Sequence, residues 1–526
     1  MLLTVNYSGI NLNPLLIKIS NEIEIKGIYK WERCINPIDN NRLKDKFHHA
    51  TPAHIKKYLY DNEISYVEVS GAKIEIYRDF FGLSDIYYCR SNDQIMISET
   101  LKDFYSYGVN SEAVEQYQRI GYVPADNTII NNVKKAFPGE RISFDIKAND
   151  VKHIRKPITD LVDQSLKFSH DNFQEQFETI LTDNLKGADG LFLSGGFDSA
   201  LLAYFLNKKG NVPVAFTGYT KDKRNQIEKK RSIKSAELFC KKHELIEFTD
   251  DDFEDIYLDV FRCMDEPFAD NAILGEAVIA MYANSRGLKR LAEGEAADAF
   301  WGHAYKIKKY LLIRKVIRND LQRNIARKIF FNTKLRKLSL PRYELIKNCS
   351  GCKCLTEKEF DDISHNLINK DYTEDYNLIN ILIFLSSNIG FEVPKVKLAA
   401  FSSGIKVIAP FLESKMMKMA LMIPPNIKYK RDKSVIKDLY ESKLLRENYE
   451  DQKTGFLVPT ADWILDNHRD ILCEGNLYEK SDIEKLVAAY KQNPQIELNQ
   501  KIWRVFVLTQ WYASNKSDLG KNRQLA

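Results

Sequence analysis

The stretch Leu191-Phe-Leu-Ser-Gly-Gly-Phe-Asp-Ser-Ala200 decides the fold of the second half of this chain. Its first three residues form a short apolar run typical of a buried strand, and the glycines after them predict a tight turn into a helix. Glycines without Cβ let backbone N–H groups approach an anion, and the helix N-terminus adds partial positive charge. The stretch therefore predicts a phosphate-binding loop rather than a plain turn.

Around this loop, predicted strands and helices alternate. The strands are expected at 191–193, 212–217, 245–248 and 288–292, and the helices at 199–206, 227–242 and 272–285. This alternation indicates βαβ units and a parallel sheet, in which ligands bind at the carboxyl ends of the strands. From about residue 300 onward, amphipathic helices dominate the pattern.

The first part of the chain reads differently, as short strands separated by turn signals. They are expected at 66–69, 73–77, 86–90 and 94–98. The polar stretch around 156–172 separates the two patterns. We therefore expect two domains, 1–160 and 165–526, the second with a helical insertion at about 304–375.

Composition excludes several classes of protein. The chain has 526 residues, 44% hydrophobic and 28% charged, with a net charge of +5. These values are typical of a folded globular protein and not of a disordered one. The eight cysteines are too few for a disulfide framework. We find no secretory signal and no apolar run of roughly 18 residues, and we expect a cytoplasmic protein.

The residues of the loop also indicate which phosphates it binds. Ser194 and Ser199 offer hydroxyl groups, and Asp198 can hold Mg²⁺ on the phosphate oxygens. The GxxxxGK[ST] pattern of γ-phosphate transferases is absent. The SGGxDS pattern is instead typical of enzymes that cut ATP between its α- and β-phosphates.

Several motifs together resemble the asparagine synthetase family, which includes β-lactam synthetases and lasso-peptide cyclases. Besides the loop, these are Asp265–Asp270, Leu291–Gly302 (similar to LSGEGxDExFGG), Ala409–Glu413 (similar to VPFLD), Lys453–Pro459 and the helix with Trp503 and Trp511. The resemblance implies an α/β fold with two parts. The first is an Ntn-hydrolase-like αββα sandwich, and the second is a parallel-sheet ATP pyrophosphatase domain of the adenine-nucleotide α-hydrolase type with a helical extension.

The first half resembles the family's class II glutamine amidotransferase domain. The matching segments are Arg78–Gly82, Tyr87-Tyr88, Ile97–Glu99 and Gly121–Pro124. Members that hydrolyse glutamine need a cysteine as their first mature residue. Here Leu2 follows Met1 and the nearest cysteine is Cys34. We therefore expect a degenerate amidotransferase domain, with a mis-assigned start as the alternative.

The resemblance implies roles for single residues. The ATP-binding set is Leu193, Ser194, Gly195, Gly196, Asp198, Ser199, Thr217, Gly218 and Gly294. Asp198 and Asp298 match the positions that hold Mg²⁺, and Glu295 matches a glutamate placed to deprotonate the amine. Lys453 matches the lysine that neutralises the leaving pyrophosphate.

Departures from the family pattern concern the acceptor pocket. The family's acidic, arginine and histidine positions are Lys406, Ile408 and Ser403 here, and Ala299 replaces the glutamate after Asp298. A pocket with different charges is not expected to hold aspartate in the usual pose. The expected function is an AMP-forming carbon–nitrogen ligase that adenylates a carboxylate and couples it to an amine. The carboxylate and the amine can belong to two substrates or to one molecule. The alternatives are an ammonia-dependent asparagine synthetase and a catalytically inactive scaffold.

Two further features have open interpretations. Cys349, Cys352 and Cys354 can give three thiolates to Zn²⁺, with His365 or His303 as a fourth ligand, or they are simply reduced thiols. Residues 304–347 hold 14 Lys and Arg against two acids. This basic segment is either a solvated helical face or a docking site for an acidic peptide or carrier protein, which we favour over nucleic acid. No membrane partner is expected, and a homodimer is left open.

Overall fold

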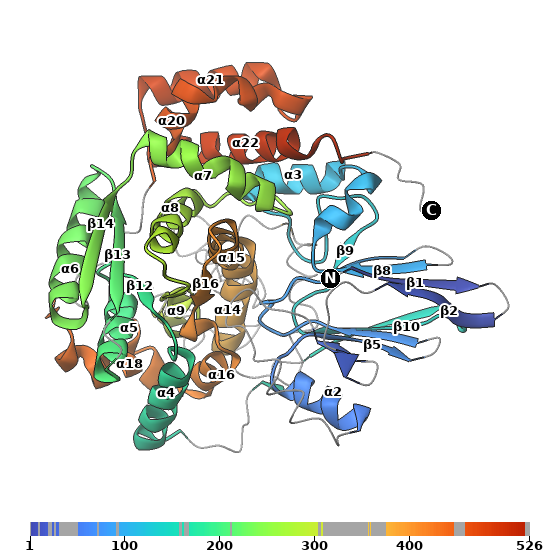
Figure 1. Ribbon diagram of the computed structural model, residues 1–526, viewed down its shortest axis with the longest axis horizontal. Coiled ribbons are helices and arrows are strands. Elements are labelled where there is room, and N and C mark those ends of the chain that lie inside the picture. Colours follow the sequence, from blue (N-terminus) through green and yellow to red (C-terminus); the bar gives the residue numbers. More distant parts are fainter. Residues whose placement is uncertain are drawn as a thin grey trace, which may run out of the picture.

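In the described part of the chain, the computed structural model has three β-sheets covered by helices (Figure 1). It describes residues 2–8, 11–18, 24–25, 28–30, 51–70, 73–90, 94–156, 160–161, 168–210, 213–302, 304, 307–308, 356, 358, 375–446 and 458–520, with the backbone alone before residue 51. The predicted domain bounds fall partly outside these ranges and stay predictions.

Two antiparallel sheets form a sandwich in the first part of the chain. One has the order β2-β1-β8-β7-β9 and the other β11-β10-β6-β5-β4-β3. The strands are β1 Leu2–Ser8, β2 Asn11–Lys18, β3 Glu24–Ile25, β4 Ile28–Lys30, β5 Tyr66–Ser70, β6 Lys73–Tyr77, β7 Tyr87–Arg90, β8 Gln94–Ser98, β9 Lys134–Lys135, β10 Glu140–Asp145 and β11 Asp150–Arg155. Alternate side chains such as Ile76, Ile97 and Ile142 fill the space between the sheets. The four strands predicted here from the sequence are confirmed.

Helices cover the outer faces of this sandwich. Helix α2 (Pro52–Asp61) packs Ile55 and Leu59 against Tyr66 and Tyr77 of the six-stranded sheet. The 3₁₀ segment η1 (Leu101–Tyr107) and α3 (Ser111–Ile120) share a core cluster with Tyr87 of the other sheet. The layers are therefore helix, sheet, sheet, helix, as the resemblance implies.

The third sheet is parallel, with the order β14-β13-β12-β15-β16. Its strands are β12 Gly190–Phe192, β13 Val214–Tyr219, β14 Lys242–Glu247, β15 Arg290–Ala292 and β16 Lys406–Ile408, and its helices include α4 His170–Asn184, α5 Phe197–Lys208, α6 Lys223–Phe239, α7 Asp250–Cys263, α8 Ala272–Ser285 and α9 Ala297–Trp301. Helices α6 and α8 lie on opposite sides of it (Figure 1). The predicted alternation is confirmed, and α7 is an additional helix that begins at a capping box formed by Thr249 and Asp252.

The order of the parallel strands creates a switch point between β12 and β15. The chain moves from β12 outward to β14, then returns to place β15 on the other side of β12. At such a point the loops that follow the two central strands leave in opposite directions, and a crevice forms between them. The predicted phosphate loop follows β12, and the acidic stretch 293–298 follows β15.

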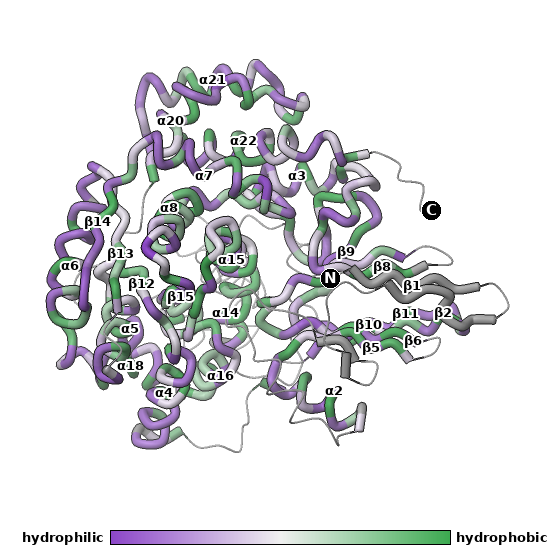
Figure 2. Tube along the Cα trace, in the orientation of Figure 1, coloured by the Kyte–Doolittle hydropathy of each residue, from purple (hydrophilic) through white to green (hydrophobic). Residues whose placement is uncertain are grey.

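A long helical stretch packs between the sheets. It consists of α14 (Asp375–Ile383), the π-helical segment η5 (Phe384–Glu392) and α15 (Val393–Ser402). Proline at 394 has no N–H to donate one turn back, so the regular pattern is interrupted just before α15. The helix Asn377–Ser402 is long and apolar enough to cross a membrane, but 76% of its apolar 18-residue stretch is buried inside the protein. Figure 2 shows this apolar character in α14, in contrast to the polar helix α6.

The C-terminal part returns to the antiparallel region. It contains η6 Pro410–Leu412, α16 Ser414–Met422, α17 Pro425–Lys428, α18 Ser434–Tyr440, η7 Glu441–Lys443, α20 Thr460–Asn467, η8 Arg469–Asn476, α21 Lys480–Gln492 and α22 Ile496–Asn515. Trp511 of α22 is fully buried, and its ring meets Tyr105 edge-on at 5.9 Å. Tyr117 of α3 donates a hydrogen bond to the carbonyl of Arg504 at 3.0 Å. One hydrophobic core therefore runs through both regions.

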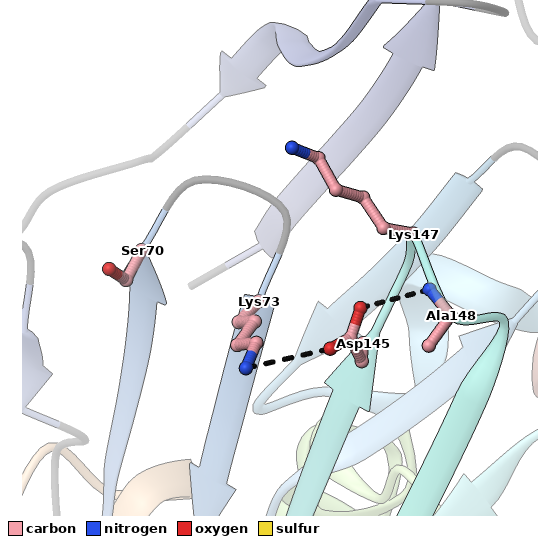
Figure 3. Close-up of a pocket in the computed structure, with 5 residues that line it drawn as sticks. All are labelled: Ser70, Lys73, Asp145, Lys147 and Ala148. Atoms are coloured by element: carbon pink, nitrogen blue, oxygen red, sulfur yellow. Dashed lines mark hydrogen bonds and ion pairs between the residues drawn. The ribbon is translucent and has the colours of Figure 1, made fainter.

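A hollow lined by Ser70, Lys73, Asp145, Lys147 and Ala148 lies at the ends of β5, β6 and β10 in the six-stranded sheet (Figure 3). Lys73 pairs with Asp145 at 3.5 Å, and Asp145 accepts a hydrogen bond from the backbone N–H of Ala148 at 3.0 Å. The hydrogen bond to Ala148 and the charge of Lys73 lower the pKa of Asp145. The hydrogen bond closes the turn between β10 and β11, and the ion pair joins β10 to β6, so these contacts have a structural explanation.

Candidate active site

The loop after β12 has the form expected of an anion-binding turn. Helix α5 begins at Phe197, with Gly196 as its N-cap. The Ser194 and Ser199 hydroxyls lie 3.1 Å apart, and Ser199 Oγ also accepts from the Ser194 N–H at 3.2 Å. Hydroxyls and N–H groups are thus gathered at the N-terminus of a helix, where an anion is stabilised. Leu193, the residue before them, is buried and donates its N–H to Phe216 O at 2.9 Å.

The two glycines of the loop serve different purposes. Gly195 has φ +78°, and a Cβ there would lie 2.6 Å from Glu228 O and 2.7 Å from Ser232 N. It is needed because α6 packs directly against the loop. A Cβ on Gly196 would meet only Ser194 Oγ at 3.4 Å. Gly196 therefore leaves the loop open on the side where a ligand would approach.

The two predicted Mg²⁺ ligands converge on one lysine. Lys433 Nζ lies 2.5 Å from Asp198 Oδ2 and 2.7 Å from Asp298 Oδ1. Asp198 is in the first turn of α5 and Asp298 in the first turn of α9. Their meeting follows from the switch point, because β12 and β15 are neighbours in the sheet. The structure brings these two residues together as the sequence predicts.

Lys433 is a site residue that the sequence does not reveal. It stands in the left-handed conformation (φ 57°) just before α18, and its N–H donates to Trp301 O at 2.9 Å. Lys437, one helical turn later, lies 5.8 Å from the centre of the Phe197 ring. Burial, then the charge of Lys433, lowers the pKa of Lys437. The only signal in the sequence is the basic run 428–433, which looks like an ordinary surface segment.

The loop after β15 packs against the phosphate loop. A Cβ on Gly294 would lie 2.9 Å from Asp198 Cβ, so glycine is required for this close approach. Ala296 has φ 64°, at the position where the GEGxD part of the family pattern has its second glycine. Gly294 therefore sets the distance between the two acidic loops.

Thr217 and Gly218 lie at the end of β13. The Thr217 hydroxyl is 4% exposed and donates to Leu193 O at 2.5 Å, with His243 Nε2 2.8 Å away. A Cβ on Gly218 would come within 2.1 Å of the Phe248 ring. Both residues therefore support the packing beneath the loop, and their predicted contact with adenosine stays a prediction.

Glu295 belongs to a second group of charged side chains behind the loops. It accepts from Lys395 Nζ at 3.0 Å, and Glu276 accepts from the same ammonium at 2.7 Å. Burial alone would lower the pKa of Lys395, but Glu276 and the other carboxylates raise it well above its usual value. Burial, opposed by Lys395, raises the pKa of Glu276 to about 7. Lys395 and Glu276 are also residues that the sequence does not single out.

A cavity of about 600 Å³ lies between the antiparallel region and α15. Two of its ion pairs join the regions: Lys397 Nζ meets Asp85 at 2.9 Å, and Lys135 Nζ meets Glu266 at 2.6 Å. Asp265 also lines it and accepts from the Thr100 hydroxyl at 2.9 Å. Burial raises the pKa of Asp265 to about 6. Because Lys395 and Lys397 are two positions apart on α15, they point to opposite sides, and the cavity lies on the side of Lys397.

Several predicted residues lie outside the described part of the chain. These are Lys453, the cysteines Cys349, Cys352 and Cys354, the two candidate histidines, and most of the basic segment 304–347. Their predicted roles remain predictions.

Comparisons with known proteins identify the family of the chain. The family model described as asparagine synthase matches residues 188–513, more than half of the chain. Asparagine synthetase [glutamine-hydrolyzing] 1 of Bacillus subtilis is 21% identical over 484 residues, which cover 83% of this chain and 75% of that protein. Putative asparagine synthetase [glutamine-hydrolyzing] 2 of Methanocaldococcus jannaschii is 26% identical over 214 residues, covering 37% and 40%.

Among solved structures, NMN synthetase from Francisella tularensis matches with 18% identity and a TM-score of 0.20, covering 48% of this chain and 94% of that one. The resemblance inferred from the motifs is confirmed by the family model, which spans both acidic loops. The chain belongs to the asparagine synthase family.

Proposed function

We propose that this chain is an ATP-dependent, AMP-forming ligase that joins a substrate carboxylate to an amine. The observation that carries the proposal is that Asp198 and Asp298 both contact Lys433 Nζ, at the switch point between β12 and β15. Carboxylates that follow two neighbouring parallel strands are well placed to act on a ligand in the crevice. The serine- and glycine-rich turn beside them suits the phosphates of ATP.

The donor set fits magnesium. Mg²⁺ prefers oxygen ligands and is commonly bound through one or two carboxylates together with substrate phosphates. Asp198 and Asp298 would hold it, and when bound it would neutralise charge on the phosphate oxygens. Lys433 and Lys437 add positive charge beside the same loop. With Mg²⁺ held by the two acids, the two lysines leave the site with net positive charge, which suits the anionic phosphates of ATP.

In the first step, the proposed reaction forms an adenylate. An oxygen of the substrate carboxylate attacks the α-phosphorus of ATP, and the bond from that phosphorus to the bridging oxygen breaks. Pyrophosphate leaves with the electron pair. The Gly196 N–H and the hydroxyls of Ser194 and Ser199 would hold the departing phosphates, and Lys453, in our proposal, stabilises their charge.

In the second step, the amine attacks the carbonyl carbon of the adenylate and AMP leaves. The nitrogen must lose a proton, and Glu295 is placed to accept it. Its Oε2 accepts from Lys395 and its Oε1 from the N–H of Ala296 at 3.2 Å, so the carboxylate is held in one orientation. Glu295 lies just before α9, and Asp298 is in the first turn of that helix.

The nucleotide products test this proposal. The protein is incubated with ATP, Mg²⁺ and a panel of carboxylic acids and amines, and the products are separated by chromatography. AMP and pyrophosphate in equal amounts are expected, whereas ADP and phosphate as the main products would contradict the reaction class. A protein with no nucleotide turnover would support the inactive scaffold instead. Formation of asparagine from aspartate and ammonia would support the ammonia-dependent synthetase.

A matched pair of variants identifies the metal ligand. Asp198→Asn should lower the rate by about a hundredfold or more, because charge at the phosphates is no longer neutralised. Asp482→Asn removes a carboxylate that is 68% exposed and far from the loop in the fold, so it should leave the rate unchanged. Turnover of Asp198→Asn within about tenfold of the wild type would remove Asp198 from the mechanism.

A further inference from the structure

Among the residues that the structure describes, the charged group behind the acidic loops has more acids than bases. Lys395 Nζ lies 2.7 Å from Glu276, 3.0 Å from Glu295 and 3.9 Å from Asp270. Glu293 adds a fourth carboxylate, and oxygen atoms of Glu276, Glu293 and Glu295 lie within 4.8 Å of one another. We call Asp270, Glu276, Glu293, Glu295 and Lys395 the acidic pocket. With all groups ionised, four negative charges surround one positive charge.

Glu293 is the member of the acidic pocket whose carboxylate has no partner among the described residues. It is only 9% exposed, and its carboxylate makes no hydrogen bond or ion pair with any residue in the described ranges. Its position is fixed, because its backbone N–H donates to Ile408 O at 2.9 Å across the edge of β15 and β16. A buried carboxylate without a partner is costly to fold, and structures hold such groups chiefly where a ligand completes them.

We propose that the acidic pocket binds a positively charged nitrogen of the substrate, an organic ammonium or guanidinium group. This inference rests on the proposed function, since it assigns the substrate class for the same site. The pocket already holds one ammonium, that of Lys395, at distances typical of N⁺–H···O⁻ hydrogen bonds. A second cationic nitrogen beside Glu293 would bring the pocket closer to neutrality.

An organic cation fits better than a metal ion. The Lys395 side chain is 9% exposed, so its ammonium is largely shielded from solvent and held among the carboxylates. A divalent ion bound to Glu276 and Glu295 would stand beside this fixed positive charge and repel it. An ammonium or guanidinium group instead donates hydrogen bonds outward and can share the carboxylates with Lys395.

The same charges disfavour an acidic acceptor. A substrate such as aspartate, with two carboxylates, would bring more negative charge next to Glu293 and Glu295. A basic substrate places its cationic nitrogen next to Glu295, three residues before Asp298 and therefore close to the phosphate site. The structure thus favours a basic amine or basic amino acid as the substrate.

The release of protons on binding can be measured and reports on occupation of the acidic pocket. Burial, then Glu276 and Glu295, raises the pKa of Glu293 well above its usual value. The other charged groups that act on this pocket are Lys395 of α15, Glu392 of η5 and Asp270 before α8. Burial likewise raises the pKa of Glu276 to about 7, so carboxyls of this pocket take up protons more readily than free ones when no cation is present. A cation that binds there should release them.

Calorimetry on the full chain without ATP tests the proposal. The probes are 1,4-diaminobutane, L-lysine and L-arginine, compared with 1,4-butanediol and succinate, in phosphate and in HEPES at pH 7. Mn²⁺ is tested in HEPES alone, because its phosphate is insoluble. Binding of at least one cationic probe is expected, with heats that differ between the buffers because protons are released. Neither butanediol nor succinate should bind.

Variants locate the binding. Glu293→Gln keeps the size of the side chain but removes its charge, and it should weaken the cationic probe at least tenfold without lowering the melting temperature. Glu244→Gln is the matched control, since Glu244 has 13% side-chain exposure and is paired with Arg286 outside the pocket. It should bind the probe as the wild type does.

Three outcomes would overturn the proposal. The first is that no cationic probe binds at about 10 mM, a concentration that corresponds to a very weak affinity. The second is that Glu293→Gln binds the cationic probe as the wild type does, and the third is that only Mn²⁺ binds and that Glu293→Gln weakens its binding. The proposed function fails separately. If cations bind but no AMP is ever formed, the ligase assignment is wrong and the pocket stands. If AMP is formed but no cation binds, the pocket assignment alone is wrong.

Discussion

Lys433 Nζ lies 2.5 Å from Asp198 Oδ2, although the two residues are 235 positions apart in the chain. The contact joins the turn before α18 to the phosphate loop, and it also neutralises two carboxylates that would otherwise repel each other. In the protein without ligands, Lys433 therefore stands where a cation is needed.

Replacing this lysine should make stability depend on magnesium. In Lys433→Met, Asp198 and Asp298 lose their shared partner, and the free energy of unfolding should fall by about 1–3 kcal/mol in EDTA, since Asp298 is partly screened by solvent. Added Mg²⁺ should restore most of the loss. Melting temperatures with EDTA and with Mg²⁺ measure both effects. Lys485→Met, which removes a 76% exposed lysine, is the control and should show neither. Equal melting temperatures for Lys433→Met and the wild type in EDTA would show that the ion pair contributes nothing.

The phosphate loop should not tolerate a side chain at Gly195. Gly195→Ala combines a left-handed backbone (φ +78°) with a Cβ only 2.6 Å from Glu228 O. Gly210→Ala shares the backbone conformation (φ +76°) but has nothing within 4 Å. We expect a loss of about 1 kcal/mol for Gly210→Ala and at least twice that for Gly195→Ala, measured by urea unfolding. Equal losses would mean that α6 does not press on the loop.

Asp265 should make stability fall as pH rises. Its folded pKa is about 6, above its ordinary value of 3.8. Between these two values the folded state holds a proton that the unfolded state has lost, so the folded state is relatively less stable above pH 6. Asp265→Asn removes the buried charge, and it should stabilise the protein by about 2 kcal/mol at pH 8 but much less at pH 4.5. The difference between variant and wild type at the two pH values is the quantity to measure. A difference that does not change with pH would place the carboxylate in solvent.

Phe81 should hold the antiparallel region against the parallel one. It is fully buried, and its ring meets those of Phe300 and Phe384 at 6.0 Å each. Phe81→Ala should cost about 3–5 kcal/mol, because it leaves a cavity beside the rings of Phe300 and Phe384. Phe401→Ala removes a ring that is 66% exposed and should cost less than about 1 kcal/mol. Chemical denaturation of both variants compares them, and similar losses would show that the aromatic contact does not join the regions.

The sequence by itself determines the local features of this protein. The strand, the two glycines and the helix around 191–200 are adjacent in the chain, so their pattern predicts both the loop and its anion-binding role. The alternation of strands and helices likewise predicts a parallel sheet, and the motif after β15 places Asp298 and Glu295 at its carboxyl edge. Each of these inferences depends on residues within about one turn or strand of each other, where local propensity acts.

Only the tertiary structure decides which charges meet. Lys433, Lys395 and Glu276 look like ordinary charged residues in the sequence, because lysine and glutamate are usually solvated on helix surfaces. They are buried because β12 and β15 are neighbours in the sheet, because a left-handed turn precedes α18, and because the helix around Pro394 packs between the sheets. Long-range packing brings Lys433 to 2.5 Å from Asp198 and Lys395 to 3.0 Å from Glu295, with Glu276 2.7 Å from Lys395. Electrostatic interactions depend on such distances and on exclusion of water rather than on separation along the chain.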